Sequence, residues 1–74
     1  MEKELNMIFM NNIAEYYSNR CWNDYEKLDF MQNKFSLKEL EVLIDIIKKK
    51  YSYAKEAINF MEEVKKDMIK KSTK

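Results

Sequence analysis

The 74-residue chain contains neither glycine nor proline, and this absence constrains its fold more than any other feature. Average proteins carry roughly 7% glycine and 5% proline, so several of each would be expected here. Glycine supplies the left-handed conformations of tight hairpin turns and phosphate-binding loops, and proline interrupts helices. Without either residue, the sequence predicts an all-α protein with few and short connections.

The clearest local pattern begins at Ser36. The four residues from Ser36 to Glu39 match a capping box, in which each of the two end side chains accepts from the other residue's backbone N–H. Phe35 and Leu40 take the positions of a hydrophobic staple around the same cap. No strong helix breaker follows for more than thirty residues, which predicts one helix over about residues 37–70.

This predicted helix carries a heptad repeat. With Leu37 as position a, nine of the ten a and d positions are apolar or aromatic, a spacing typical of a helix that packs along another helix in a coiled coil. An adjoining apolar set makes the stripe wider than a two-stranded coiled coil needs, which favours two neighbouring helices. This set comprises Val42, Ile46, Tyr53, Ala57, Phe60 and Val64.

The first half of the chain is less regular. Its apolar residues recur at three- and four-residue intervals, which predicts one helix over about residues 3–32. An alternative places a break near residue 23, because the stretch from Asn23 to Glu26 is itself a plausible capping box. The turn between the two halves is expected at Asn33-Lys34, since asparagine tolerates the left-handed conformation at a helix end.

These segments predict a long antiparallel helical hairpin. It would form a single domain over residues 1–71, followed by a disordered tail at residues 72–74. Two helices cannot cover both apolar faces of the second one. We therefore expect a homodimer that closes into a four-helix bundle, or docking of the open face onto a different protein.

The charge balance and the single cysteine indicate the environment. A net charge of +1 is far from that of a dedicated nucleic-acid binder. The chain has no long apolar stretch and no positively charged export signal at its start, so we expect a cytoplasmic protein that does not enter a membrane. Cys21 is expected to be a small buried hydrophobe; the alternative is a reactive thiol beside Arg20.

Candidate catalytic and metal-binding groups are scarce. The chain has no histidine, which removes the ordinary base at neutral pH, the Ser-His and Cys-His pairs, and Cys/His zinc sites. Carboxylates one or two positions apart point in different directions on a helix, so they do not form a shared acid–base site. We expect no enzymatic activity, no cofactor, no metal and no small-molecule substrate.

Aromatic residues are the strongest candidates for binding another protein. A tyrosine combines apolar area with a hydroxyl, which suits half-buried interface positions. The alternative is that the same side chains pack the interior of the hairpin. The predicted interface consists of Tyr16, Tyr17, Trp22, Tyr25, Tyr51, Tyr53 and Phe60.

One basic cluster lies within the predicted second helix. Successive residues lie about 100° apart around a helix, so its three adjacent lysines do not form one patch. The chain also has a single arginine, the residue best suited to bidentate phosphate and base contacts. The candidate phosphate contacts are Lys48, Lys49, Lys50 and Lys55.

Together these patterns predict a small non-enzymatic protein that regulates or inhibits a larger protein by binding it through its aromatic and heptad helix faces. The lysine- and asparagine-rich composition suggests an AT-rich genome and is consistent with a phage or mobile-element protein. The alternative is a dimeric, nucleic-acid-associated transcriptional regulator.

Overall fold

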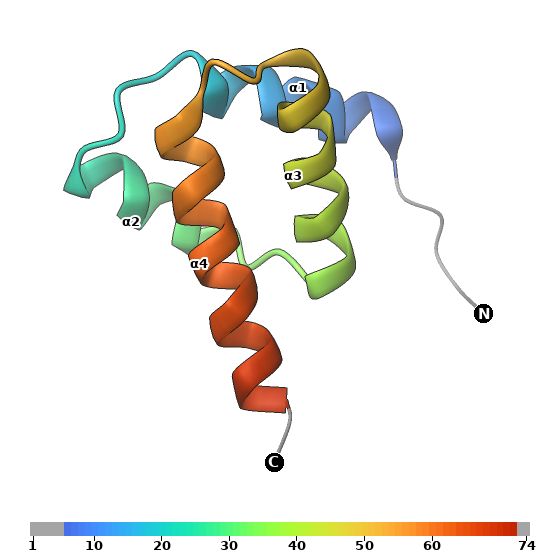
Figure 1. The fold of residues 1–74 in the computed structure, drawn as a ribbon, viewed down its shortest axis with the longest axis vertical. Coiled ribbons are helices and arrows are strands. Elements are labelled where there is room, and N and C mark those ends of the chain that lie inside the picture. Colours follow the sequence, from blue (N-terminus) through green and yellow to red (C-terminus); the bar gives the residue numbers. More distant parts are fainter. Residues whose placement is uncertain (1–5, 73–74) are drawn as a thin grey trace.

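A computed structural model describes residues 6–72 as four α-helices (Figure 1). Helix α1 spans Met7–Ser18, α2 spans Asp24–Gln32, α3 spans Leu37–Lys50 and α4 spans Lys55–Ser72. The described part of the chain has no strand, so the predicted all-α class is confirmed. None of the helices within this part has the length and apolarity needed to span a bilayer.

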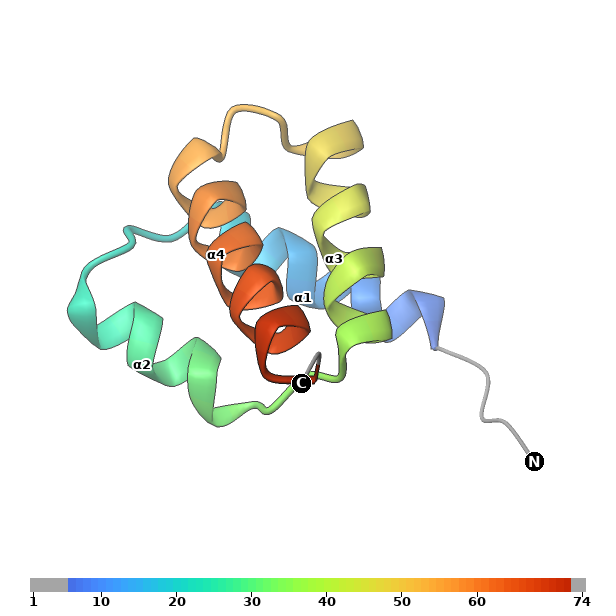
Figure 2. The ribbon, with the colours of Figure 1, turned by 60° about the horizontal axis from the view of Figure 1, so that its bottom comes forward.

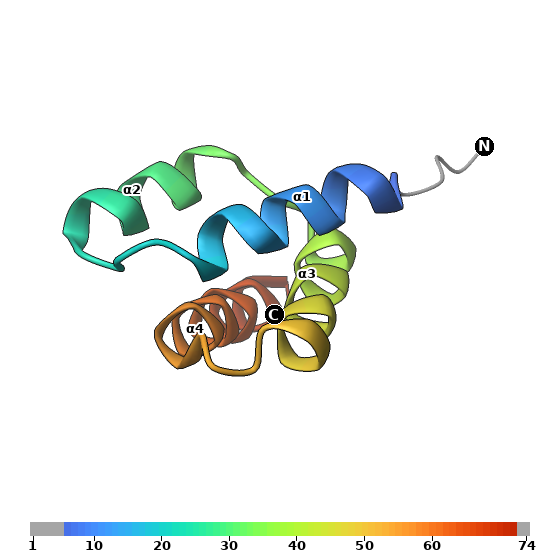
Figure 3. The ribbon, with the colours of Figure 1, turned by 90° about the horizontal axis from the view of Figure 1, so that it is seen from above.

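The helices form two layers. Helices α3 and α4 lie side by side and run in opposite directions (Figures 1 and 2). Helices α1 and α2 form the second layer, with α1 packed on α3 and α2 on the side of α4 (Figure 3). Helix α3 therefore has two helical neighbours within the same chain, which are α1 and α4.

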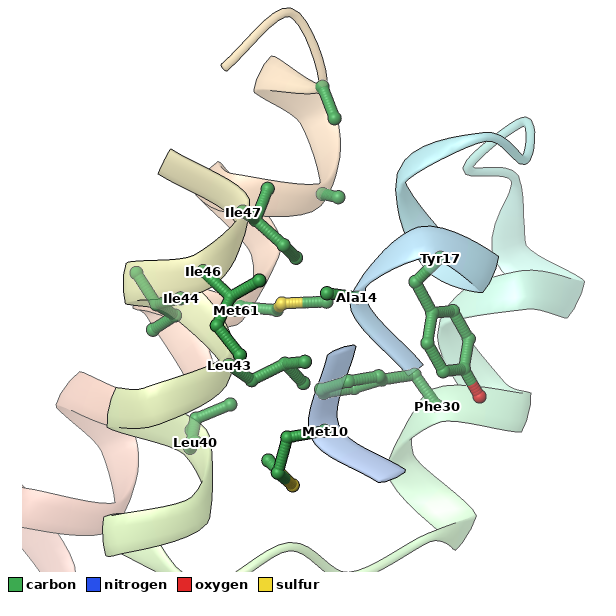
Figure 4. Close-up of a cluster of buried hydrophobic side chains, with 12 residues drawn as sticks. Met10, Ala14, Tyr17, Phe30, Leu40, Leu43, Ile44, Ile46, Ile47 and Met61 are labelled. Carbon is green, nitrogen blue, oxygen red and sulfur yellow. The ribbon is translucent and has the colours of Figure 1, made fainter. Parts of the chain in front are cut away.

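The hydrophobic core lies between α1, α3 and α4. Figure 4 shows side chains from these helices meeting in one interior, with Phe30 of α2 reaching toward its edge. Short isolated helices are marginal in water, so this shared core stabilises all of them. The largest fully buried side chains are Met10, Leu40, Leu43, Ile47 and Met61.

The start of α3 has the capping hydrogen bonds that the sequence predicts. The Glu39 N–H donates to the Ser36 hydroxyl at 3.1 Å, and the Ser36 N–H donates to the Glu39 carboxylate at 2.9 Å. The predicted capping box is therefore confirmed. Phe35 packs against the buried cluster that contains Leu40, as a hydrophobic staple would place it.

The predicted single helix over residues 37–70 is wrong. The chain leaves the helix at Tyr51 and enters α4 at Lys55. A tight turn joins the two helices, in which the Ala54 N–H donates to the Tyr51 carbonyl at 2.9 Å.

Burial explains this break. Serine and tyrosine at positions 51–53 have only modest helix propensity, so interrupting the helix there costs little. The break lets α4 fold back on α3, so that the apolar residues of the two helices, which are the two halves of the heptad pattern, face each other in one core. Ion pairs also cross between these helices, from Lys48 to Glu62 at 2.6 Å and from Lys65 to Glu41 at 3.9 Å.

The predicted continuous helix over residues 3–32 is also wrong, and the alternative break near residue 23 occurs. Helix α1 ends at Ser18, and Asn23 caps α2 by accepting from the Glu26 N–H at 2.9 Å. Only this half of the second capping box forms, because the Glu26 carboxylate pairs with Arg20 instead. The first residues of the predicted helix lie outside the described part of the chain.

The turn predicted at Asn33-Lys34 is confirmed, with one difference. The left-handed residue is Lys34, whose φ is 56°, whereas Asn33 keeps a right-handed helical conformation. Asn33 instead uses its side-chain amide, which donates to the Tyr17 hydroxyl at 2.9 Å and to the Asp29 carbonyl at 3.1 Å. The amide therefore ties the end of α2 to α1.

The sequence predicted two neighbouring helices for the wide apolar stripe. For α3, both neighbours come from the same chain, because α1 and α4 both cover it. The homodimer and the four-helix bundle of two hairpins stay predictions. The predicted tail at residues 72–74 falls mostly outside the described residues, although α4 includes Ser72.

Candidate protein-binding groove

Five aromatic rings form a cluster that joins α2 to the rest of the fold. They are referred to below as the aromatic cluster and comprise Tyr17, Trp22, Phe30, Phe35 and Phe60. The Phe30 ring contacts the other four, with centroid distances of 5.1 to 5.9 Å. The Trp22 indole N–H also donates to the Tyr17 carbonyl at 2.7 Å. Three predicted interface residues, Tyr17, Trp22 and Phe60, therefore contribute to packing inside the chain.

The Tyr17 hydroxyl is held in a polar network at the edge of the aromatic cluster. It donates to the Asp29 carboxylate at 3.0 Å and accepts from the Asn33 amide at 2.9 Å. Burial, with a smaller contribution from Asp29, raises the pKa of Tyr17 to about 12. The neutral phenol is therefore the form that the folded chain favours.

This raised pKa predicts a loss of stability at high pH. The ordinary tyrosine pKa is about 10, so the stabilisation by the neutral Tyr17 phenol is complete below about pH 10 and disappears as the pH rises to about 12. Its size is at most on the order of 3 kcal/mol, since the pKa rises by about two units and each unit corresponds to about 1.4 kcal/mol. Urea unfolding of the wild type and of Tyr17→Phe across this range measures it. The variant should lose less stability, and equal losses would contradict the prediction.

The other four predicted interface residues lie on the surface or near it. Tyr16 is half exposed and lies beneath the Arg20 guanidinium at 4.6 Å, and Tyr25 is 76% exposed. Tyr53 is exposed and donates to the Asn19 side chain at 2.9 Å, and Tyr51 is half-buried beside it. The structure therefore does not bring all seven residues into one surface.

Three of the four candidate phosphate-contacting lysines have acceptors within the chain. Lys48 binds Glu62, and this hydrogen bond lowers the pKa of the Glu62 carboxyl. Lys55 begins α4, one connection away from the other three. The remaining contacts run from Lys49 to Asp45 at 3.3 Å and from Lys50 to Asn11 at 3.0 Å.

A groove lies between α2 and α4. Its main cavity has a volume of about 630 Å³. A smaller cavity of about 130 Å³ adjoins it and shares Met31, Val64 and Met68 with it. The floor of this α2–α4 groove is apolar and consists of Leu28, Met31, Phe60, Val64 and Met68.

The floor residues lie one helical turn apart on each wall. On α4 they are separated by four residues, and on α2 by three, so each set lines one face of its helix. Leu28 is 58% exposed and Met31 is 50% exposed. The groove therefore leaves apolar side chains in contact with solvent. Of the interface residues predicted from the sequence, only Phe60 lines it.

The rim of the groove is charged. Asp24 lies on the α2 wall, and Glu63 and Asp67 lie on the α4 wall. Within residues 6–72, none of these three carboxylates has an ion-pair or hydrogen-bonding side-chain partner. Of the rim lysines, Lys27 lies over the Phe60 ring at 5.7 Å, and Lys71 lies at the far end. The rim therefore carries three acidic and two basic side chains, and both of the acids on the α4 wall lie between Phe60 and Lys71.

The expectation that Cys21 is buried is wrong. Its thiol is exposed, because the chain leaves α1 after Ser18 and turns Cys21 outward in the connection to α2. The part of the chain that the structure describes holds no group of three potential metal-ligating side chains.

Comparison with known proteins found no matching family model, curated sequence or solved structure. The α2–α4 groove is therefore interpreted from its own geometry and charge.

Proposed function

We propose that this chain is a small non-enzymatic regulator that binds a larger protein through the α2–α4 groove. The observation that carries the proposal is the solvent exposure of Leu28 and Met31, which belong to the apolar floor of the groove. The core between α1, α3 and α4 is already closed by the chain itself. Exposed apolar residues gathered along a groove are typical of a surface that a partner covers.

The way α2 is held supports this proposal. Its buried residues are Glu26 and Phe30, which are fixed by Arg20 and by the aromatic cluster. These contacts anchor the inner side of the helix and leave Leu28 and Met31 on the groove. One side of α2 thus packs into the fold through Phe30, and its other side presents Leu28 and Met31 to the groove.

Two methionines make the groove adaptable. The side chains of Met31 and Met68 are unbranched and polarisable, so they adjust to the shape of an inserted apolar group. A chain of this size would regulate or inhibit its partner by occupying a segment that the partner needs for its own contacts.

Co-purification with charge substitutions tests this function. The tagged wild type, Leu28→Asp and Ile8→Asp are each purified from cells with nuclease treatment. Ile8 is 75% exposed on α1, so its substitution is a matched control outside the groove. The wild type and Ile8→Asp should retain one stoichiometric protein, and Leu28→Asp should lose it, with all three folded by circular dichroism.

Two outcomes would contradict the proposal. Retention of the same protein by Leu28→Asp would place its binding site elsewhere on the chain. Recovery of nucleic acid alone, removed by nuclease, would instead support the nucleic-acid-binding alternative that the sequence left open.

A further inference from the structure

We propose that the α2–α4 groove accepts a basic amphipathic helix of the partner. This inference rests on the proposed function and specifies the chemistry of the bound segment. Three properties of the groove support it. They are the spacing of the apolar residues along its floor, the lack of free backbone hydrogen-bonding groups in its helical walls, and the charge of its rim.

The floor has the dimensions of a short helix. The α4 wall runs from Phe60 to Lys71, which at 1.5 Å per residue is about 17 Å, or three helical turns. Apolar floor residues recur once per turn along this wall. A partner helix of about eleven residues with apolar side chains at i, i+3 or i+4, and i+7 matches this length and spacing.

Both walls of the groove are helices, and this favours a helix as the occupant. The backbone N–H and C=O groups inside α2 and α4 are used within those helices, and residues 6–72 contain no strand edge. An extended peptide would therefore find no backbone hydrogen bonds in the groove. A helix satisfies its own backbone and needs only side-chain contacts.

The rim determines the sign of the partner's charge. Three acids face the groove, Asp24 from α2 and Glu63 and Asp67 from α4, against the two rim lysines. Within residues 6–72, none of the three acids forms an ion pair. Glu63 and Asp67 are one turn apart, and like charges at this spacing on a helix repel each other. Lysine or arginine side chains flanking the partner's apolar stripe would relieve this repulsion, whereas acidic ones would add to it.

Designed peptides test the inference on the full chain. Two helical peptides of about 14 residues share the same leucine positions, at i, i+3, i+7 and i+10. One carries lysine at every flanking position and the other carries glutamate. A third peptide has the lysine composition with its leucines out of register. Calorimetry gives the affinities, and amide NMR shifts locate the binding.

The lysine peptide should bind at least about tenfold more tightly than either of the other two, with shifts centred on Leu28, Met31 and Met68. Glu63→Lys combined with Asp67→Lys should reverse the preference between the lysine and glutamate peptides. Glu15→Lys combined with Glu56→Lys changes the net charge equally but alters exposed acids outside the groove, so the original preference should remain.

The outcomes separate this inference from the proposed function. Equal binding of the lysine and glutamate peptides, or tighter binding of the glutamate peptide, would contradict the proposal that the bound segment is basic. The groove would remain the binding site. If neither peptide bound, the proposal that the occupant of the groove is a helix would be contradicted. Self-association of the chain through Leu28, seen by sedimentation and excluding both peptides, would make the occupant a second copy. The Leu28→Asp co-purification tests the proposed function independently of all three.

Discussion

Replacing Phe30 with alanine should destabilise the chain by about 3–5 kcal/mol, as expected for a buried aromatic residue. The side chain is 2% exposed, and its ring contacts all four other members of the aromatic cluster. Phe30 is also the one apolar residue among the buried residues of α2. A nine-residue helix is not stable alone, so α2 should detach from α4 when this ring is removed.

Trp22 reports this detachment directly, because its ring lies against Phe30 and Phe60. In urea unfolding of Phe30→Ala, the Trp22 fluorescence should change at lower denaturant than the circular dichroism. The matched control is Tyr25→Ala on the same helix, at a position 76% exposed, which should change stability by no more than about 0.5 kcal/mol. A loss below about 1 kcal/mol for Phe30→Ala would contradict the role assigned to the cluster.

Replacing Leu43 with alanine should cost about 2–5 kcal/mol for a different reason. Leu43 is fully buried on α3, the helix that both α1 and α4 pack against. The cavity left by the substitution would weaken the central core, so all of the helices should unfold together. Fluorescence and circular dichroism transitions should therefore shift to lower denaturant by the same amount.

Ile8→Ala is the control for Leu43→Ala, because it removes an aliphatic side chain from an exposed helical position. It should change the free energy of unfolding by no more than about 0.5 kcal/mol. If Leu43→Ala separated the two transitions as Phe30→Ala should, α3 would not be the common support of the fold.

The sequence predicts local features of this fold well where one short pattern determines the structure. The capping box at Ser36 and Glu39 and the turn at Asn33-Lys34 depend on a few neighbouring residues, and both are present. The break at Tyr51 is different, because its cause is the burial of α4 residues against α3 residues far away in the chain. No glycine or proline occurs at this break, so the apolar periodicity of the sequence predicted an uninterrupted helix there.

The groove could not be predicted from the same patterns. It exists because the aromatic cluster fixes how α2 is rotated, and that rotation depends on contacts of Phe30 with rings from other parts of the chain. One signal was present in the sequence. Phe30 lies about 200° around the helix from Leu28 and about 100° from Met31, whereas Leu28 and Met31 share one face, so burying Phe30 leaves the other two uncovered.

Site-specific photo-crosslinking in cells tests whether a partner protein occupies the α2–α4 groove. A photoreactive amino acid replaces Leu28 in the groove or Ile8 on α1, both in the full chain. We expect position 28 to crosslink to one protein, through a helical segment rich in lysine or arginine, and position 8 not to do so. Equal crosslinking of that protein from both positions, or no crosslinked protein at position 28, would contradict it.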